Sequence, residues 1–207
     1  MARLEVLPAE AIEDPDLRKM MKETGGDEMF GVYGHHPSLF KGFLDFYLPA
    51  KFSGLLPFKL KELVRLRIAD LNDCRRWQLS RAPSGGEPGE YDELFEKLSN
   101  VTRRSHREAA ALDFAERMAE AHDTMDDAFM KNLRACFSDA EIIELGLVTG
   151  AFIALGRLHR ALDIAPMEDG AHAAFRWGNR KEIVMFNHVM VGAKNIDESK
   201  QFYDAIL

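Results

Sequence analysis

A long apolar segment around residue 150 constrains the fold of this 207-residue chain more than any other feature. Ser138 and Glu141 form a capping box at its start, in which the serine accepts a backbone N–H and the glutamate reaches back. A helix with apolar residues nearly all round is usually buried on several sides, so we expect other helices and an oligomer interface to cover it. Its apolar residues are Ile142, Ile143, Leu145, Leu147, Val148, Phe152, Ile153 and Leu155.

Helical signals also dominate the rest of the chain, and the predicted fold class is all-α, with roughly six to eight helices. A second capping box, Ser105 with Glu108, marks another helix start. The Gly- and Pro-rich stretch 82–90 is predicted to be an exposed loop. We expect one helical domain over residues 1–180. Further helices are predicted at residues 14–24, 39–52, 59–71 and 91–98.

Composition excludes several classes of protein. The net charge of −7 and the lack of a basic stripe argue against nucleic-acid binding. There is no run of about 18 apolar residues, so no membrane span is expected. The acidic N-terminus lacks the apolar core of a signal peptide, and two cysteines are too few for a disulfide scaffold. A cytoplasmic protein in a reducing compartment is the expectation.

The candidate chemistry begins at a cysteine that follows a predicted turn. Asn72 and Asp73 favour a helix end and a turn, which would place Cys74 in the first turn of the next helix. Free backbone N–H groups and the helix dipole favour a thiolate there. Arg75 and Arg76 would add to that effect, and Asp73 would oppose it. The sequence therefore predicts a reactive thiol at Cys74.

The spacing around this cysteine resembles the motif of the carboxymuconolactone decarboxylase and alkyl hydroperoxidase D superfamily. Thiol-active members carry a Glu and, after eleven further residues, Cys-x-x-Cys-x-x-x-His. Glu62 and Cys74 match the Glu and the first Cys. Trp77 stands at the second Cys and Arg81 at the His, so two functional positions depart from the pattern.

A second block, residues 137–164, is similar to the closing helix of that family. The resemblance covers residues 39–164. It implies a multi-helix alkyl hydroperoxidase D-like bundle that assembles as a homo-oligomer, a trimer or a hexamer. It also implies a small-molecule substrate, with no cofactor and no metal.

The resemblance implies catalytic roles for Cys74 and Glu62. Trp77 cannot resolve an oxidised cysteine, and Arg81 cannot relay a proton near neutral pH. Arg81 would instead pair with Glu62, or bind a carboxylate of a ligand with Trp77 as a flat apolar wall. His159, on the closing helix, could contribute to the same pocket, and we count these three as substrate-binding candidates.

Three functions follow from these residues. The first is thiol-dependent peroxide reduction, with Cys74 as the attacking thiolate. The second is cofactor-free decarboxylation of a small carboxylated lactone, with Arg81 holding the carboxylate and Glu62 shuttling a proton. The third is a non-catalytic helical oligomerisation or ligand-binding module. For peroxide reduction to turn over, an external thiol or Cys136 would have to reduce the oxidised Cys74.

The last residues, 181–207, change to strand-like composition followed by a helical pattern. This segment resembles the opening strand and helix of a vicinal oxygen chelate (glyoxalase-like) domain. His188 would match the first metal ligand of that superfamily, but one strand cannot complete a metal shell. We therefore expect a truncated βα fragment after the helical domain.

Overall fold

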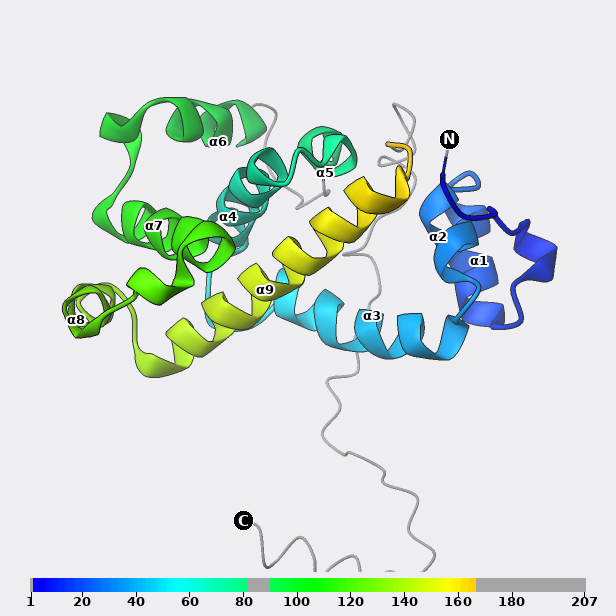
Figure 1. Cartoon of the computed structure of the whole chain (residues 1–207), viewed down its shortest axis with the longest axis horizontal. Helices are drawn as coiled ribbons and strands as arrows, with labels where there is room; N and C mark the ends of the chain where they lie inside the picture. The colour runs from blue at the N-terminus through cyan, green and yellow to red at the C-terminus, as the bar shows by residue number, and fades with distance from the viewer. Residues whose placement is uncertain (1, 82–89, 167–207) are drawn as a thin grey trace, which may run out of the picture.

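The structure is a computed structural model, and it describes residues 2–81 and 90–166. These residues form nine α-helices and three short 3₁₀-helices, with no strand among them, which confirms the all-α prediction (Figure 1). The predicted βα fragment with His188, and the boundary after residue 180, lie outside the described residues. The α-helices are α1 (Pro15–Glu23), α2 (Glu28–Tyr33), α3 (Pro37–Phe52), α4 (Phe58–Leu71), α5 (Arg75–Leu79), α6 (Glu90–Ser99), α7 (His106–Glu120), α8 (Asp127–Arg134) and α9 (Asp139–Leu162).

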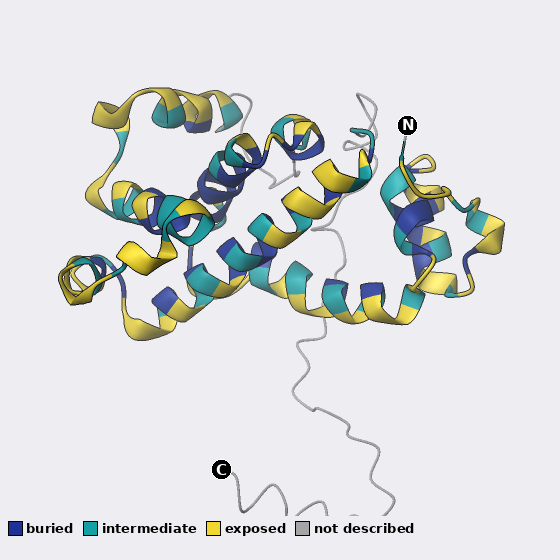
Figure 2. Cartoon of the chain, in the orientation of Figure 1, coloured by how far each residue is buried: buried dark blue, intermediate teal, exposed yellow. Residues whose placement is uncertain are grey.

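The core forms where α4 and α9 pack against each other and against α7 (Figure 1). Dark, fully buried residues line the facing sides of these helices, and the outer sides are exposed (Figure 2). Nine of the fourteen residues of α4 are buried, including three charged ones, Lys61, Glu62 and Arg65. Charged side chains inside a core need partners there, so α4 is where polar chemistry is expected.

A smaller hydrophobic cluster joins α1 and α2 to the first half of α3. This cluster lies at the opposite end of the molecule from α6, α7 and α8, and α3 connects it to the central helices (Figure 1). A buried ion pair, Arg76 to Asp27 at 2.5 Å, also ties the N-terminal helices to α5. The site described below lies along this junction.

Both predicted capping boxes are formed. Ser138 accepts from the N–H of Glu141, and the carboxylate of Glu141 accepts from the N–H of Ser138; Ser105 and Glu108 do the same. The number of helices exceeds the prediction because α2 and α8 are only six and eight residues long. Such short elements carry too few repeats for a periodic pattern to show.

The longest helix, α9, meets the length and composition test for a membrane span. The core helix of a soluble protein passes the same test, and eight residues of α9 are buried against other helices. Its other face is apolar and uncovered: Ile143 is 65% exposed and Leu147 54% exposed. A Cβ added to Gly150 would meet nothing within 4 Å, so packing within the chain does not require that glycine.

The oligomer that the resemblance implies stays a prediction, and this face of α9 is where we expect it to form. The double substitution Ile143→Glu and Leu147→Glu would place charges on the face and should reduce the particle to a monomer. Light scattering after size exclusion measures the mass. Val101→Glu, at a site that is 68% exposed on another helix, is the control. A monomeric wild type, or an unchanged mass in the variant, would contradict the prediction.

Candidate functional site

Cys74 follows a turn that packs against α9. Asn72 ends α4, Asp73 adopts a left-handed conformation with φ 48°, and Cys74 is the residue before the first turn of α5. The side-chain amide of Asn72 donates to the carbonyl of Ile153 at 3.3 Å. A Cβ at Gly156 would come within 2.6 Å of that amide nitrogen, so any other residue there would displace the Asn72 side chain from this position.

Burial decides the state of the Cys74 thiol. The residue is 1% exposed, and burial raises the pKa of Cys74 above its usual value. The N–H of Trp77 and the guanidinium of Arg76 oppose this rise without reversing it. The expectation of a favoured thiolate is therefore wrong. Cys74 lies one position before the helix rather than in its first turn, and α5 has only five residues.

Alkylation kinetics test this state directly. In a Cys136→Ser background, the alkylation rate of Cys74 should still be rising at pH values where a free thiol, with a pKa of about 8.5, has levelled off. The raised pKa delays formation of the reactive thiolate. A Cys74→Ser protein that retains Cys136 gives the comparison rate. A rate that levels off below about pH 8 would contradict the structure.

Glu62 is the centre of a buried polar cluster. Arg65 donates from Nε to Oε1 and from Nη2 to Oε2, both at 2.9 Å. The hydroxyl of Tyr91 donates to Oε2 at 2.7 Å, and Nζ of Lys51 lies 3.2 Å from Oε1. Although burial alone would raise it, Arg65 and Lys51 lower the pKa of Glu62 to about 2. A carboxylate held in this way stays ionised and is a poor proton shuttle near neutral pH.

Arg81 does not take the place predicted for it. Its Nη1 donates to the carbonyls of Gln78 and Ser80, at 2.7 and 2.9 Å. Its guanidinium stacks on the rings of Tyr91 and Phe95, at 5.0 and 4.7 Å from their centroids. The predicted Glu62–Arg81 ion pair is therefore wrong, because Arg65, one helical turn from Glu62 on α4, occupies the carboxylate instead.

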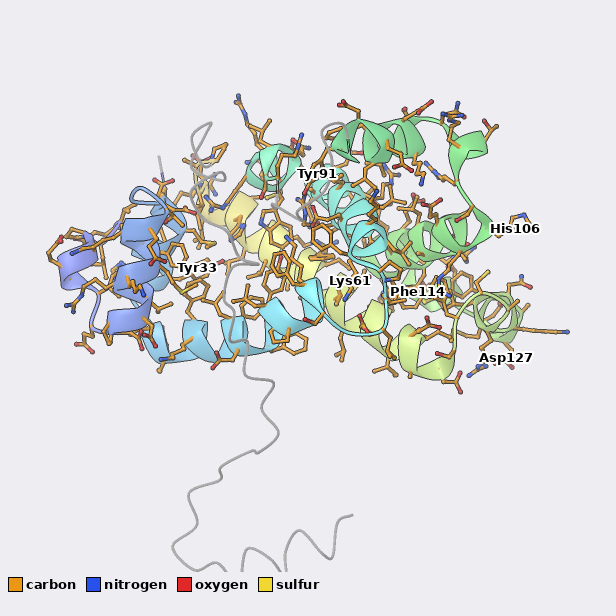
Figure 3. The ribbon with its side chains drawn as sticks, turned by 180° about the vertical axis from the view of Figure 1, so that it is seen from behind. Tyr33, Lys61, Tyr91, His106, Phe114 and Asp127 are labelled. Atoms are coloured by element: carbon orange, nitrogen blue, oxygen red, sulfur yellow. The ribbon has the colours of Figure 1, made fainter. Side chains whose placement is uncertain are left out.

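A cavity of about 80 Å³ lies beside this cluster, between α2, α3, α5 and α9. One ordered water needs only about 10–15 Å³ and benzene occupies a cavity of about 150 Å³, so the space can hold a few waters or the head group of a small molecule. Trp77 and His159 both line it, with their rings edge to face at 5.5 Å. Tyr33, at the end of α2 and labelled in Figure 3, also lines it, with its ring centroid 5.8 Å from that of His159. The two predicted residues Trp77 and His159 thus come together, while Arg81 is not among the lining residues.

Three polar atoms of the cavity-lining residues have no hydrogen-bond partner among the described residues. These atoms are the two ring nitrogens of His159 and the hydroxyl oxygen of Tyr33. His159 is 1% exposed, and burial, followed by the charge of Arg76, lowers its pKa to about 3. The ring is therefore neutral near pH 7 and offers one donor and one acceptor. Burying such groups without partners costs about 1–3 kcal/mol each, so the cavity is built to hold something polar.

Comparison with known proteins identifies the fold. No family model and no curated protein matches the sequence. A peroxidase-related protein from Ralstonia eutropha JMP134, described as an alkylhydroperoxidase AhpD core, superposes with a TM-score of 0.66. The pair share 21% identity over 84% of this chain and 96% of that one. The chain has the AhpD core fold. A peroxidase-related protein from Silicibacter sp. TM1040 agrees, with a TM-score of 0.64 and 20% identity over 83% and 94% of the two chains.

On this AhpD core fold, sequence reasoning missed three residues of the site. Arg65 lies three residues after Glu62, and this helical i,i+3 spacing was the available signal. Lys51 and Tyr33 carried no such signal, because each reaches the site only through the packing of α3 and α2 against α4, α5 and α9. The roles predicted for Cys74 and Glu62 remain proposals.

Proposed function

We propose that this AhpD-fold protein binds a small molecule in the cavity between α2, α3, α5 and α9. The observation that carries the proposal is that His159 and Tyr33 line one space with buried polar atoms that have no hydrogen-bond partner among the described residues. A ligand with acceptor oxygens would take hydrogen bonds from the hydroxyl of Tyr33 and from the ring N–H of the neutral His159. Trp77 supplies an aromatic wall at the position where a thiol cycle would need its second cysteine.

Binding fits the geometry better than either catalytic hypothesis. Lactone decarboxylation needs Glu62 to exchange a proton and Arg81 to reach the substrate. Glu62 is instead locked as a carboxylate by Arg65, and Arg81 lies against Tyr91 and Phe95. Of the hypotheses from sequence, the ligand-binding module is the one that uses the cavity as it stands.

Trp77 provides the experiment, because it is one of only two tryptophans and lines the cavity. Benzamide is a suitable probe, since its ring matches an aromatic wall and its amide both donates and accepts. In a Trp177→Phe background, benzamide should change the Trp77 fluorescence saturably. His159→Leu should weaken the apparent affinity about tenfold, the loss of roughly one hydrogen bond. His122→Leu, at an exposed position, is the control. The absence of any saturable change would refute the proposal.

A second candidate function is slow peroxide reduction by Cys74 alone. The Arg76 guanidinium and the N–H of Trp77 lie close enough to stabilise a thiolate in part, and the similar structures are described as peroxidase-related. The thiolate sulfur would attack one peroxide oxygen, the O–O bond would break, and the alcohol would leave. A first external thiol would then condense with the sulfenic acid to a mixed disulfide, with release of water. A second external thiol would attack that disulfide, return Cys74 to the thiol and leave as the disulfide of the two external thiols. Thiol-dependent peroxide consumption that persists in Cys74→Ser would exclude this function.

A further inference from the structure

Lys51 is a buried amine that faces the cavity. It lies in the last turn of α3, is 6% exposed, and lines the same space as Trp77 and His159. Its one polar contact among the described residues is the carboxylate of Glu62, at 3.2 Å. The rest of its surroundings are aromatic, since Nζ lies 5.1 Å from the Phe52 ring centroid and 6.0 Å from that of Tyr47.

The charges around Lys51 do not balance. Arg76 is paired with Asp27, and both side chains are buried. Arg65 holds both oxygens of Glu62, so the single charge of that carboxylate is shared between Arg65 and Lys51. The described residues at this end of the cavity therefore bring three cations together with two carboxylates. Nearby Tyr47, Tyr91 and His159 are neutral near pH 7 and do not change the count.

An uncompensated buried charge is strongly destabilising, and either an anion or the loss of a proton would relieve it. Burial, opposed by Glu62 and assisted by Arg65, lowers the pKa of Lys51. A bound anion would relieve the excess positive charge by direct pairing.

We infer that the cavity takes a small monoanion of the carboxylate class, with its head group on Nζ of Lys51 and an apolar body against the aromatic wall. This inference rests on the proposed binding function and specifies its ligand. The wall is formed by three aromatic residues and one leucine, namely Phe40, Phe43, Trp77 and Leu155. Lys51, and not Arg81, is then the residue that recognises the carboxylate.

Proton uptake distinguishes this inference from simple hydrophobic binding. An anion beside Nζ favours the ammonium form, so binding raises the pKa of Lys51 and takes up a proton between the unbound and bound pKa values. The affinity for an anion should therefore fall as pH rises through that interval. The affinity for a neutral ligand of the same shape should not follow this trend.

Benzoate and benzamide form a matched pair for the test, because they share a shape and differ in charge. Calorimetry at pH 8 in HEPES and in Tris gives the affinity and the number of protons taken up. We expect wild-type protein to bind benzoate at least tenfold more tightly than benzamide, with proton uptake. Lys51→Met should lose that preference and the uptake, with its affinity for benzoate falling to that for benzamide. Lys59→Met, which removes an exposed lysine on α4, should behave as wild type.

Three results would overturn the inference: benzamide binding as tightly as benzoate, benzoate binding unchanged in Lys51→Met, or no proton uptake. If benzamide binds and benzoate does not, the cavity binds small molecules but the ligand class is wrong. If neither binds, the proposed function itself fails. A thermal melt of Lys51→Met shows whether the variant is folded; it should be at least as stable as wild type, because an unbalanced buried charge is gone.

Discussion

Arg65→Met is expected to destabilise the protein by about 3–5 kcal/mol, the cost of leaving one partner of a buried ion pair without the other. Arg65 is 1% exposed and is the main partner of Glu62. It also donates to the carbonyls of Trp77 and Ser80, and so fastens α5 to α4. Removal of its guanidinium leaves two carbonyls and a carboxylate poorly satisfied. Urea unfolding of both proteins measures the difference.

Arg67→Met is the matched control, because Arg67 lies on the same helix but is 31% exposed and pairs with Asp70 and Glu116 at the surface. Its loss should cost less than about 1 kcal/mol. Equal effects of the two substitutions would contradict the buried cluster.

Acid unfolding is a second test of the Arg65–Glu62 ion pair. The folded pKa of Glu62 is about 2, below the unfolded value of about 4.3, so the contribution of Glu62 to the free energy of unfolding is complete above the unfolded pKa. The contribution is lost as pH falls towards the folded value. In Arg65→Met the folded pKa moves up, so the stability difference between the two proteins should shrink as pH falls from about 5 to about 2.

His159→Leu is expected to stabilise the empty protein by as much as about 1–3 kcal/mol, the cost of a buried polar group without a partner. Leucine fills the space with an apolar side chain and leaves no orphaned nitrogen. Most substitutions of a fully buried residue destabilise, so a gain here would mark a residue kept for binding. Thermal unfolding without ligand measures it, with exposed His122→Leu as the reference. A loss of more than about 2 kcal/mol would mean that His159 has partners in solution.

Most of the fold could be predicted from local chemistry. Serine and glutamate at the spacing of a capping box fixed the starts of α7 and α9, since each box depends only on four consecutive residues. The unbroken apolar surface of α9 correctly predicted a central helix. The short helices α2 and α8 were missed because their stability comes from caps at Asp27 and Asp126 and from packing, not from a long repeat.

The site was predictable only in part. Trp77 and His159 could be placed near each other, because a motif helix and a closing helix pack together in the fold that the sequence resembles. The motif spacing pointed to Arg81 as the partner of Glu62, whereas the partner in the structure is Arg65. The partner depends on which guanidinium is buried beside Glu62, and the guanidinium of Arg81 instead stacks on the rings of Tyr91 and Phe95. The state of Cys74 also depends on burial, which outweighs the neighbouring arginine.

Whether the function lies in the cavity is tested most directly by the dissociation constant of benzamide, measured for wild type, Tyr33→Phe and Cys74→Ser. Tyr33→Phe removes a hydroxyl that has no partner in the described part of the chain, and it keeps the ring that stacks on Phe40. If the cavity is the functional centre, Tyr33→Phe should bind about tenfold more weakly and Cys74→Ser should bind as wild type. Unchanged binding in Tyr33→Phe together with lost binding in Cys74→Ser would place the function at the thiol and contradict the account.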